Sequence, residues 1–293
     1  PLHLCLSPTH MDVSVVIVNW KVKDLLRRCL ESVYRETKGV SFEVFVTDND
    51  SRDGSVEMVL KDFPQATLIA SNRNLGFAAG NNPAIMRSEG EFVLLLNPDA
   101  ELRDDAISAM VAYMRRNQHI GILGPRLVGA DGKLQPSVRR FPTLLSQALI
   151  MLKLHHLLRR LSPFRRYFAD DFDYAKAASV DQVMGAAFMI RRQVVHALGG
   201  LDERFFIWFE EVDYCKRAKD AGFQVWYAPV ATIVHHGGES FSKAFGPTKQ
   251  KYFNDSLRKY FAKHHGVLAA LAIIILAPFS LGLAWLVQAR RRR

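Results

Sequence analysis

The chain has 293 residues, of which 49% are hydrophobic and 23% are charged, a balance that excludes a disordered, collagenous or low-complexity protein. Three cysteines are too few and too scattered for a disulfide framework, which favours a reducing compartment. The formal net charge of +10 suits nucleic acid, anionic lipid or a phosphorylated substrate. Because the basic clusters lie beside leucine-rich sequence, we expect a membrane surface as a partner and no nucleic acid.

Residues 1–10 have no basic region of the kind that opens a signal peptide, so we expect a disordered leader or tag there, with Met11 as the natural start. From Met11 onward, β-rich runs alternate with segments of helical periodicity. This alternation predicts an α/β fold with a doubly wound, mostly parallel sheet, whose ligand crevice lies at the carboxyl ends of the strands. The expected strands are residues 13–19, 42–48, 66–70, 92–97 and 231–235, and the expected helices are residues 24–36, 56–63, 78–88 and 104–116.

The strand end that most strongly suggests a functional site is the sequence LLLNPDAEL, in which a buried strand stops at Asn97-Pro98-Asp99. A carboxylate at the end of a rigid strand can hold a divalent cation that bridges a diphosphate, although Asp99 also suits a turn that caps the next helix. Downstream, the strand that ends at His235 could supply a second ligand to the same metal. Adjacent histidines are usually surface residues, so both interpretations stay open.

Residues 204–217 join a run of bulky apolar side chains to a Glu-Glu-x-Asp cluster at an expected helix start. Acids at that place would stabilise the positive end of the helix dipole. Alternatively, a carboxylate held against an aromatic wall could accept a proton from an acceptor hydroxyl. Spacing alone leaves both interpretations of Glu210, Glu211 and Asp213 open.

Seven sequence blocks in a fixed order carry a resemblance that covers residues 13–240. They are VSVVIVNW, TDNDSRDGS, NRNLGFAAGNN, LLLNPDAEL, VMGAAFMIRR, GGLDERFFIWFEEVDYCKRAKDAGF and VHHGGES. Together they resemble the family 2 inverting glycosyltransferases with the GT-A fold, and within them the bacterial rhamnosyltransferase-like branch. The resemblance implies a Rossmann-like GT-A sheet with helices on both faces, to which this chain adds a C-terminal hydrophobic membrane-anchoring segment.

The resemblance also implies roles for residues of the nucleotide-sugar site. Asp48 would contact the nucleobase, and Asn49 or Ser51 would shape its pocket. Asp99 would bind Mg²⁺ or Mn²⁺ on the diphosphate, with His235 as the second ligand because it fits the family's spacing better than its neighbour. The first acid of the family's metal motif is replaced here, which leaves one strong acidic ligand. The other residues implied for this site are Asn19, Asn74, Gly76, Asn81 and Asn97, and those implied for the acceptor side are Gly185 and residues 199–202.

The catalytic base of the family is the acid of a Glu-Asp pair, and that pair reads Glu210-Glu211 here. Glu211 is therefore the first candidate for the base, with Glu210 and Asp213 behind it, and its side chain is one methylene longer than that of Asp. The base would deprotonate an acceptor hydroxyl as that hydroxyl attacks the anomeric carbon, in a single displacement that inverts configuration.

The implied reaction moves L-rhamnose from dTDP-L-rhamnose to a glycan on a polyprenyl diphosphate, in cell-envelope polysaccharide synthesis. No residue of the sequence specifies the sugar, so a UDP-sugar donor, carrying galactofuranose or N-acetylglucosamine, stays an alternative. A membrane-bound scaffold that binds a sugar nucleotide without activity is another, because the Glu-Glu pair departs from the family's pattern. A Rossmann dehydrogenase is disfavoured, since no GxGxxG follows the first strand.

We divide the chain into a nucleotide-sugar-binding half (residues 11–130), an acceptor-binding and catalytic half (residues 131–247), a juxtamembrane helix (residues 248–266) and a membrane segment with an Arg tail (residues 267–293). Within the last part, residues 267–287 carry no charge and are long enough to span a bilayer. We expect them to anchor the protein at the cytoplasmic face of the inner membrane, where nucleotide sugars are available.

The path of this anchor is open. Basic residues flank both of its ends, and a straight span would place four arginines outside, against the positive-inside tendency. A re-entrant hairpin broken near Pro278 therefore competes with a straight span, and a core helix or an oligomer contact is a further alternative. Residues 143–161, which are leucine-rich and basic at their end, predict either an amphipathic helix on anionic lipid or a helix packed on the sheet.

Overall fold

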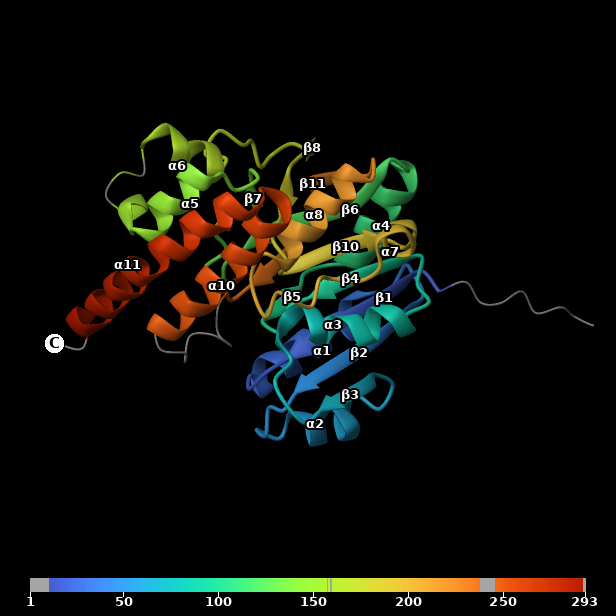
Figure 1. Ribbon diagram of the computed structural model, residues 1–293. Helices are drawn as coiled ribbons and strands as arrows, with labels where there is room; N and C mark the ends of the chain where they lie inside the picture. The colour runs from blue at the N-terminus through green and yellow to red at the C-terminus, as the bar shows by residue number, and fades with distance from the viewer. Residues whose placement is uncertain (1–10, 157, 159, 238–245, 292–293) are drawn as a thin grey trace, which may run out of the picture.

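The computed structural model describes residues 11–156, 158, 160–237 and 246–291, so the expected leader at residues 1–10 lies outside the described residues. A nine-stranded sheet forms the centre of the molecule, and helices lie on both of its faces (Figure 1). The strand order is β3-β2-β1-β4-β10-β6-β11-β5, with β8 paired to β11. The predicted α/β class is confirmed.

The strands combine a parallel half with antiparallel insertions. β1 to β4 pair in parallel, and so do β6 and β11, whereas β10 runs antiparallel between β4 and β6 and β5 runs antiparallel to β11. The first four predicted strands are confirmed to within one residue, and residues 231–235 are the end of a longer strand. The strands are β1 (Val13–Asn19), β2 (Phe42–Asn49), β3 (Thr67–Ser71), β4 (Phe92–Leu96), β5 (Ala100–Leu102), β6 (Ile120–Val128), β8 (Ala178–Ser179), β10 (Ala187–Arg191) and β11 (Gln224–His235), with β7 (Val138–Arg139) paired to β9 (Gln182–Val183) in a separate ribbon.

Two apolar cores hold the helices against the two faces of the sheet. In α1, buried side chains such as Leu26 and Leu30 recur at helical spacing and turn one stripe of the helix toward the strands. α1, α2 and α4 pack on one face of the sheet, and α3, α7 and α8 pack on the other. The four predicted helices are confirmed to within two residues. These helices are α1 (Lys23–Glu36), α2 (Ser55–Asp62), α3 (Gly76–Arg87), α4 (Ala106–Arg116), α7 (Arg192–Leu198) and α8 (Glu210–Asp220).

A third apolar core joins the C-terminal helices α10 (Gly246–His264) and α11 (Val267–Arg291) to the rest of the protein. Phe261 and Ile273 of these helices pack with Phe205 and Phe209, which lie just before α8. The segment that leads into α8 is therefore held between the sheet and the C-terminal helices.

Of the alternatives for the membrane segment, the hairpin broken near Pro278 is wrong, because α11 continues through that residue. An internal proline costs a helix one hydrogen bond and about 3 kcal/mol, but α10 packs along α11, with Gly246 close to Gln288, and this packing offsets the loss. Among the described residues, 267–289 form the one helix that is long and apolar enough to cross a membrane.

The prediction of one long helix over residues 143–161 is also wrong. Thr143 caps α5 (Leu144–Met151) through a capping box with Ser146, and the helix ends before Lys153, whose φ of 60° lies in the left-handed region. A 3₁₀ turn at Leu154–His156 and the short α6 (Ser162–Tyr167) follow. The segment is thus a folded cap beside α11 (Figure 1).

Candidate active site

A cavity of about 350 Å³ lies at the carboxyl ends of β1, β2 and β4, where an open parallel sheet places its ligand crevice. Residues 206–208 and the start of α8 form the opposite wall. Most of the residues that the sequence indicates for the site meet here. Those that line the cavity are Asn49, Asn74, Gly76, Asn97, Asp99, Gly185, Glu210, Glu211 and His235.

Asn19, Asp48 and Ser51 form a buried hydrogen-bonded group that does not line the cavity. The two carboxylate oxygens of Asp48 accept hydrogen bonds from Asn19 Nδ2, at 2.8 Å, and from the backbone N–H of Ser51, at 3.0 Å. These bonds fix the loop that follows β2, and the contact of Asp48 with a nucleobase stays a prediction. Asn81 is also buried outside the cavity, where its amide donates to the carbonyl of Phe77 at 2.8 Å.

Gly76 lies where the loop after β3 meets the segment before α8. Its φ is 82°, its N–H donates to Asn74 Oδ1 at 2.9 Å, and its carbonyl accepts from Asn49 Nδ2 at 2.9 Å. The N–H of Phe77 donates to the carbonyl of Phe206 at 2.7 Å. A Cβ at position 76 would lie 2.2 Å from that same oxygen, so the close approach of these two loops requires glycine.

We expect Gly76→Ala to lower kcat by about 10²-fold, because the added Cβ must push the Phe206 carbonyl, and the segment that carries the glutamates, away by about 1 Å. Gly222→Ala is the matched control: Gly222 also has a positive φ, 87°, but nothing lies within 4 Å of the position that a Cβ would take there. Gly222→Ala should lose about 1 kcal/mol of stability through its positive φ alone, and Gly76→Ala should lose more because of the added clash. Steady-state kinetics and thermal unfolding of the two proteins check this, and equal activity losses would contradict it.

Asp99 and His235 face one another at the end of β4 and β11. Asp99 Oδ1 lies 3.3 Å from His235 Nε2, and both side chains are buried. The other imidazole nitrogen, Nδ1, donates to Gln135 Oε1 at 2.7 Å, since an amide oxygen can only accept. With Nδ1 as the donor, Nε2 is the nitrogen of the neutral ring that can bind a metal ion, and it lies beside Asp99 and 3.3 Å from the amide nitrogen of Asn97.

This donor set fits a divalent cation. An imidazole nitrogen oriented by a second hydrogen bond is the usual form of a metal-ligating histidine, and Mg²⁺ or Mn²⁺ beside a phosphorylated substrate commonly has only one or two protein carboxylates. The described residues contain no group of three or more His, Cys, Asp and Glu suited to a metal. Asp99 and His235 would therefore share the cation with oxygens of the substrate and water.

Glu210 and Glu211 are the first two residues of α8, and both line the cavity. Trp208 and Phe209 before them have φ values of 63° and 71°, a conformation that costs a non-glycine residue about 1–3 kcal/mol. This strained turn directs the start of α8 toward the cavity. Among the described residues, neither Glu210 Oε2 nor Glu211 Oε2 has a hydrogen-bond partner, which indicates that a bound molecule completes the site.

Burial raises the pKa of both carboxyl groups. For Glu210 the negative charge of Glu211 adds to the effect of burial and lifts the pKa well above its ordinary value. For Glu211, backbone hydrogen bonds oppose the effect of burial. Glu210 is 5% exposed, whereas Glu211 is half-buried, so Glu211 is the carboxyl group that an acceptor hydroxyl reaches more easily. This difference in access favours Glu211 as the base.

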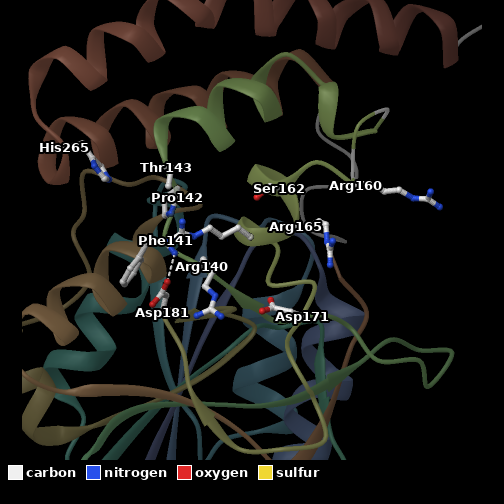
Figure 2. A pocket seen from close by; sticks show the side chains of 11 residues that line it. Arg140, Phe141, Pro142, Thr143, Arg160, Ser162, Arg165, Asp171, Asp181 and His265 are labelled. Atoms are coloured by element: carbon white, nitrogen blue, oxygen red, sulfur yellow. Dashed lines mark hydrogen bonds between the residues drawn. The ribbon is translucent and has the colours of Figure 1, made fainter.

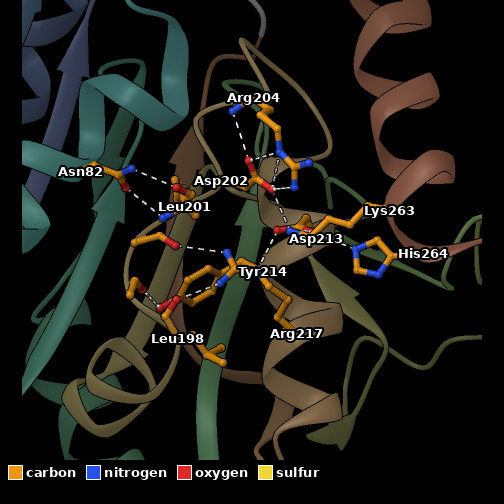
Figure 3. Close-up of polar contacts among 12 residues, drawn as sticks. Asn82, Leu198, Leu201, Asp202, Arg204, Asp213, Tyr214, Arg217, Lys263 and His264 are labelled. Atoms are coloured by element: carbon orange, nitrogen blue, oxygen red, sulfur yellow. Dashed lines mark hydrogen bonds and ion pairs between the residues drawn. The ribbon is translucent and has the colours of Figure 1, made fainter.

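Asp213 does not line the cavity and lies instead among Arg217, Lys263 and His264 (Figure 3). Its carboxylate, which is fully buried, accepts from Arg217 Nε at 2.8 Å and from His264 Nε2 at 2.7 Å, and lies 2.6 Å from Lys263 Nζ. Burial alone would raise the pKa of Asp213, but the hydrogen bonds from His264 and Lys263, together with the Arg217 charge, lower it. Lys263 also pairs with Asp202. The cluster ties α8 to the end of α10.

We expect Asp213→Asn to destabilise the protein by about 3 kcal/mol at pH 7, because it leaves Lys263 and Arg217 without the buried carboxylate that they share. Since the pKa of Asp213 is lowered on folding, the ionised carboxylate stabilises the protein above the unfolded pKa, near 3.8, and this contribution is lost as the pH falls through the lower folded pKa. The difference in unfolding free energy between wild type and variant should therefore shrink below about pH 4. Urea unfolding at pH 7 and pH 3 measures it, and a constant difference would contradict this account.

Gln135, which contacts His235 beside the cavity, is a residue that the sequence did not reveal. It follows a polar turn after β6 and belongs to no sequence motif. The parallel pairing of β6 with β11, in which Val128 lies opposite Val234, brings that turn beside His235. Only the three-dimensional pairing of two strands that are far apart in sequence could have identified it.

Comparisons with known proteins bear on this geometry. The family model described as Glycosyl transferase family 2 matches residues 14–198. The chain is 28% identical over 240 residues to the N-acetylglucosaminyl-diphospho-decaprenol L-rhamnosyltransferase of Mycobacterium tuberculosis, with 77% of this chain and 76% of that protein covered. It is 23% identical over 220 residues to the dTDP-rhamnosyl transferase RfbF of Shigella flexneri, with 74% and 67% covered.

Among solved structures, the mannosyltransferase PcManGT of Pyrobaculum calidifontis, in complex with GDP-Man and Mn²⁺, superposes with a TM-score of 0.57 at 16% identity, over 94% of this chain and 73% of that one. The fold is that of the GT-A glycosyltransferases. The chain belongs to glycosyl transferase family 2, and the relatives named above are rhamnosyltransferases; the predicted family and enzyme class are confirmed.

Proposed function

We propose that this glycosyltransferase is metal-dependent and inverting, and that it moves L-rhamnose from dTDP-L-rhamnose to a hydroxyl of a glycan on a polyprenyl diphosphate in cell-envelope polysaccharide synthesis. One observation carries the proposal: a single cavity of about 350 Å³ holds both the Asp99–His235 pair and the two glutamates with unpartnered oxygens. The donor and the acceptor class follow from what the names of the two relatives say of those proteins.

The reaction is a single displacement. Glu211 accepts the proton of the acceptor hydroxyl as its oxygen forms a bond to the anomeric carbon, and the bond from that carbon to the diphosphate breaks on the opposite face. Glu210, still protonated, keeps a second negative charge away from Glu211. Asn97, Asp99 and His235 bind the diphosphate end of the donor, and a Mg²⁺ or Mn²⁺ ion held by Asp99 and His235 would neutralise charge on the leaving group.

We further propose that α11 anchors the enzyme at the cytoplasmic face of the membrane. Side chains such as Leu268, Ile275 and Phe279 are 84%, 67% and 62% exposed, respectively, which is a large apolar surface for a protein in water. Basic residues flank the helix in sequence and suit anionic headgroups.

A donor panel tests the proposed function. Purified protein is incubated with dTDP-L-rhamnose, UDP-N-acetylglucosamine or UDP-galactofuranose, with Mn²⁺ or Mg²⁺, and with N-acetylglucosamine on a polyprenyl diphosphate. We expect transfer of rhamnose with inverted configuration, detected by mass spectrometry and NMR. Transfer from a UDP-sugar and not from dTDP-L-rhamnose would identify that UDP-sugar as the donor. Donor binding without any transfer would indicate a scaffold instead of an enzyme.

A further inference from the structure

A second cavity, of about 880 Å³, lies apart from the active site and shares no lining residue with it. It is bounded by residues 140–143, by Arg160 and α6, and by His265 at the turn between α10 and α11 (Figure 2). Its most frequent side chain is arginine, and we call it the arginine cavity. The arginines that line it are Arg140, Arg160, Arg165 and Arg166.

The charge of the arginine cavity is not balanced from within. Its two acids are Asp171 and Asp181, and Asp181 is already engaged by the backbone N–H of Phe141, at 3.1 Å, and by Lys219, at 3.2 Å. Within the described part of the chain, no carboxylate forms an ion pair with any of the four arginines. Several guanidinium groups around one cavity, without carboxylate partners, suit phosphate groups, because their planar forks match phosphate oxygens.

The arginine cavity lies close to the catalytic glutamates. Asp181 lines it, and the chain continues from there through β9 to Gly185, which lines the active site. Four extended residues span at most about 14 Å, so the two cavities are separated by no more than the reach of a short glycan. Gly185 faces Glu211, whose Cβ lies 3.6 Å from the position of a Cβ at 185.

Apolar surface borders the same cavity on the other side. Thr143 lines it and is followed two residues later by Leu145 in α5, which is 59% exposed. His265 lines it too, and α11 begins two residues later with Val267, which is 72% exposed. A molecule that fits this arrangement has phosphate groups joined to a long apolar chain.

We propose that the arginine cavity binds the diphosphate of the lipid-linked acceptor, with the polyprenyl chain lying along α5 and α11 and the glycan extending along β9 toward Glu211. This inference rests on the proposed function for the identity of the glycan, but the binding of a lipid diphosphate can be measured without it. The nucleotide sugar has its own diphosphate site beside Asp99, so the two phosphorylated substrates occupy different cavities.

Binding of farnesyl diphosphate in neutral detergent micelles tests the proposal, with the triple variant Arg140→Gln/Arg165→Gln/Arg166→Gln against wild type. The control is Arg87→Gln/Arg103→Gln/Arg116→Gln, which removes the same charge from exposed arginines outside both cavities. We expect the cavity variant to bind at least about tenfold more weakly and the control to bind as wild type does. Equal weakening in both variants would show a general charge effect and overturn the proposal.

Two further arms identify the source of the phosphate. Inorganic diphosphate should bind far more weakly than farnesyl diphosphate; equal affinity would overturn the lipid part of the proposal. If the cavity variant loses flotation with phosphatidylglycerol vesicles but binds farnesyl diphosphate normally, the cavity serves bulk anionic lipid and the proposal fails.

Enzyme kinetics test whether the arginine cavity binds the acceptor during the transfer reaction. In the transfer assay the cavity variant should raise KM for the polyprenyl-diphosphate acceptor at least about tenfold, with KM for the donor unchanged. It should also act normally on the same glycan carried by an uncharged alkyl chain, and an equal loss on both acceptors would overturn the proposal. If wild type transfers no sugar but binds farnesyl diphosphate in this cavity, the proposed function alone fails.

Discussion

Glu211→Gln should lower kcat by about 10²- to 10⁴-fold while the enzyme still binds its donor, because the amide keeps the size of the side chain and cannot accept a proton. The raised pKa makes this carboxylate a stronger base than a glutamate in water, and its unpartnered oxygen lies in the cavity. Single-turnover transfer, together with calorimetric binding of dTDP-L-rhamnose, separates the chemical step from binding. Loss of donor binding in proportion to activity would contradict the role as a base.

Glu210→Gln is the matched control for this experiment. Because Glu210 keeps its proton in the proposed active form, a neutral amide imitates it, and most of the activity should remain. Both variants also remove a buried carboxyl group whose ionisation burial opposes, so the melting temperature at pH 7 should not fall in either. If instead Glu210→Gln abolishes transfer and Glu211→Gln does not, the roles of the two residues are reversed.

The raised pKa of Glu211 also predicts how the activity of the wild-type enzyme depends on pH. Glu211 must be ionised to act, and its pKa is raised from the ordinary value of 4.5. The quantity kcat/KM should therefore fall as the pH falls through a value above 4.5, and this acidic limb should disappear in Glu211→Gln. An acidic limb that persists in the residual activity of the variant would assign it to another group.

The parallel part of the sheet was predictable because β1 and β4 are buried on both faces and read as nearly continuous apolar runs. β10 escaped prediction because its five residues run directly into α7, and its place between β4 and β6 depends on a crossover that chain order does not specify. α11 escaped the expected break because packing against α10, not local propensity, decides the fate of Pro278.

The site residues also fall into those that the sequence could predict and those whose roles depend on contacts between distant parts of the chain. Asp99 and His235 were predictable as candidates because both end strands, and the carboxyl ends of strands in an open sheet converge. Asp213 was one of three acids that the spacing could not separate, although about 100° per residue already places it about 200° around the helix from Glu211. Its actual partners, Lys263 and His264, come from α10, much later in the chain, so no local pattern could have shown that it ties two helices together.

The packing of the C-terminal helices explains why the segment before α8 can hold a strained turn. Phe205 and Phe209 are fixed in the third core by α10 and α11, and Asp213 is fixed by the end of α10. The strain at Trp208 and Phe209 is therefore maintained by the C-terminal helices, which are the part of the enzyme that we place at the membrane. The position of α10 and α11 therefore affects the orientation of Glu210 and Glu211.

Asp99→Ala should abolish metal-dependent donor binding and lower kcat/KM by about 10³-fold, because it removes the acidic ligand of the proposed cation. A bound cation stabilises the charge that develops on the leaving diphosphate by several kcal/mol. Removal of the metal from wild type with EDTA should have a similar effect, and EDTA should have little further effect on the variant. Calorimetry of dTDP-L-rhamnose with and without Mn²⁺ measures both. Donor binding that is the same with and without metal in wild type would refute metal dependence.

The neighbouring histidines provide a graded series for the same site. His235→Ala should weaken Mn²⁺ binding strongly, whereas His236→Ala should not, because His236 does not line the cavity and instead lies 2.8 Å from Glu101. Gln135→Leu should fall between them, with about 10- to 100-fold weaker metal binding, because it removes the acceptor that orients the imidazole of His235 without removing a ligand. If Gln135→Leu binds Mn²⁺ as wild type does, the hydrogen bond at Nδ1 is not what orients that ligand.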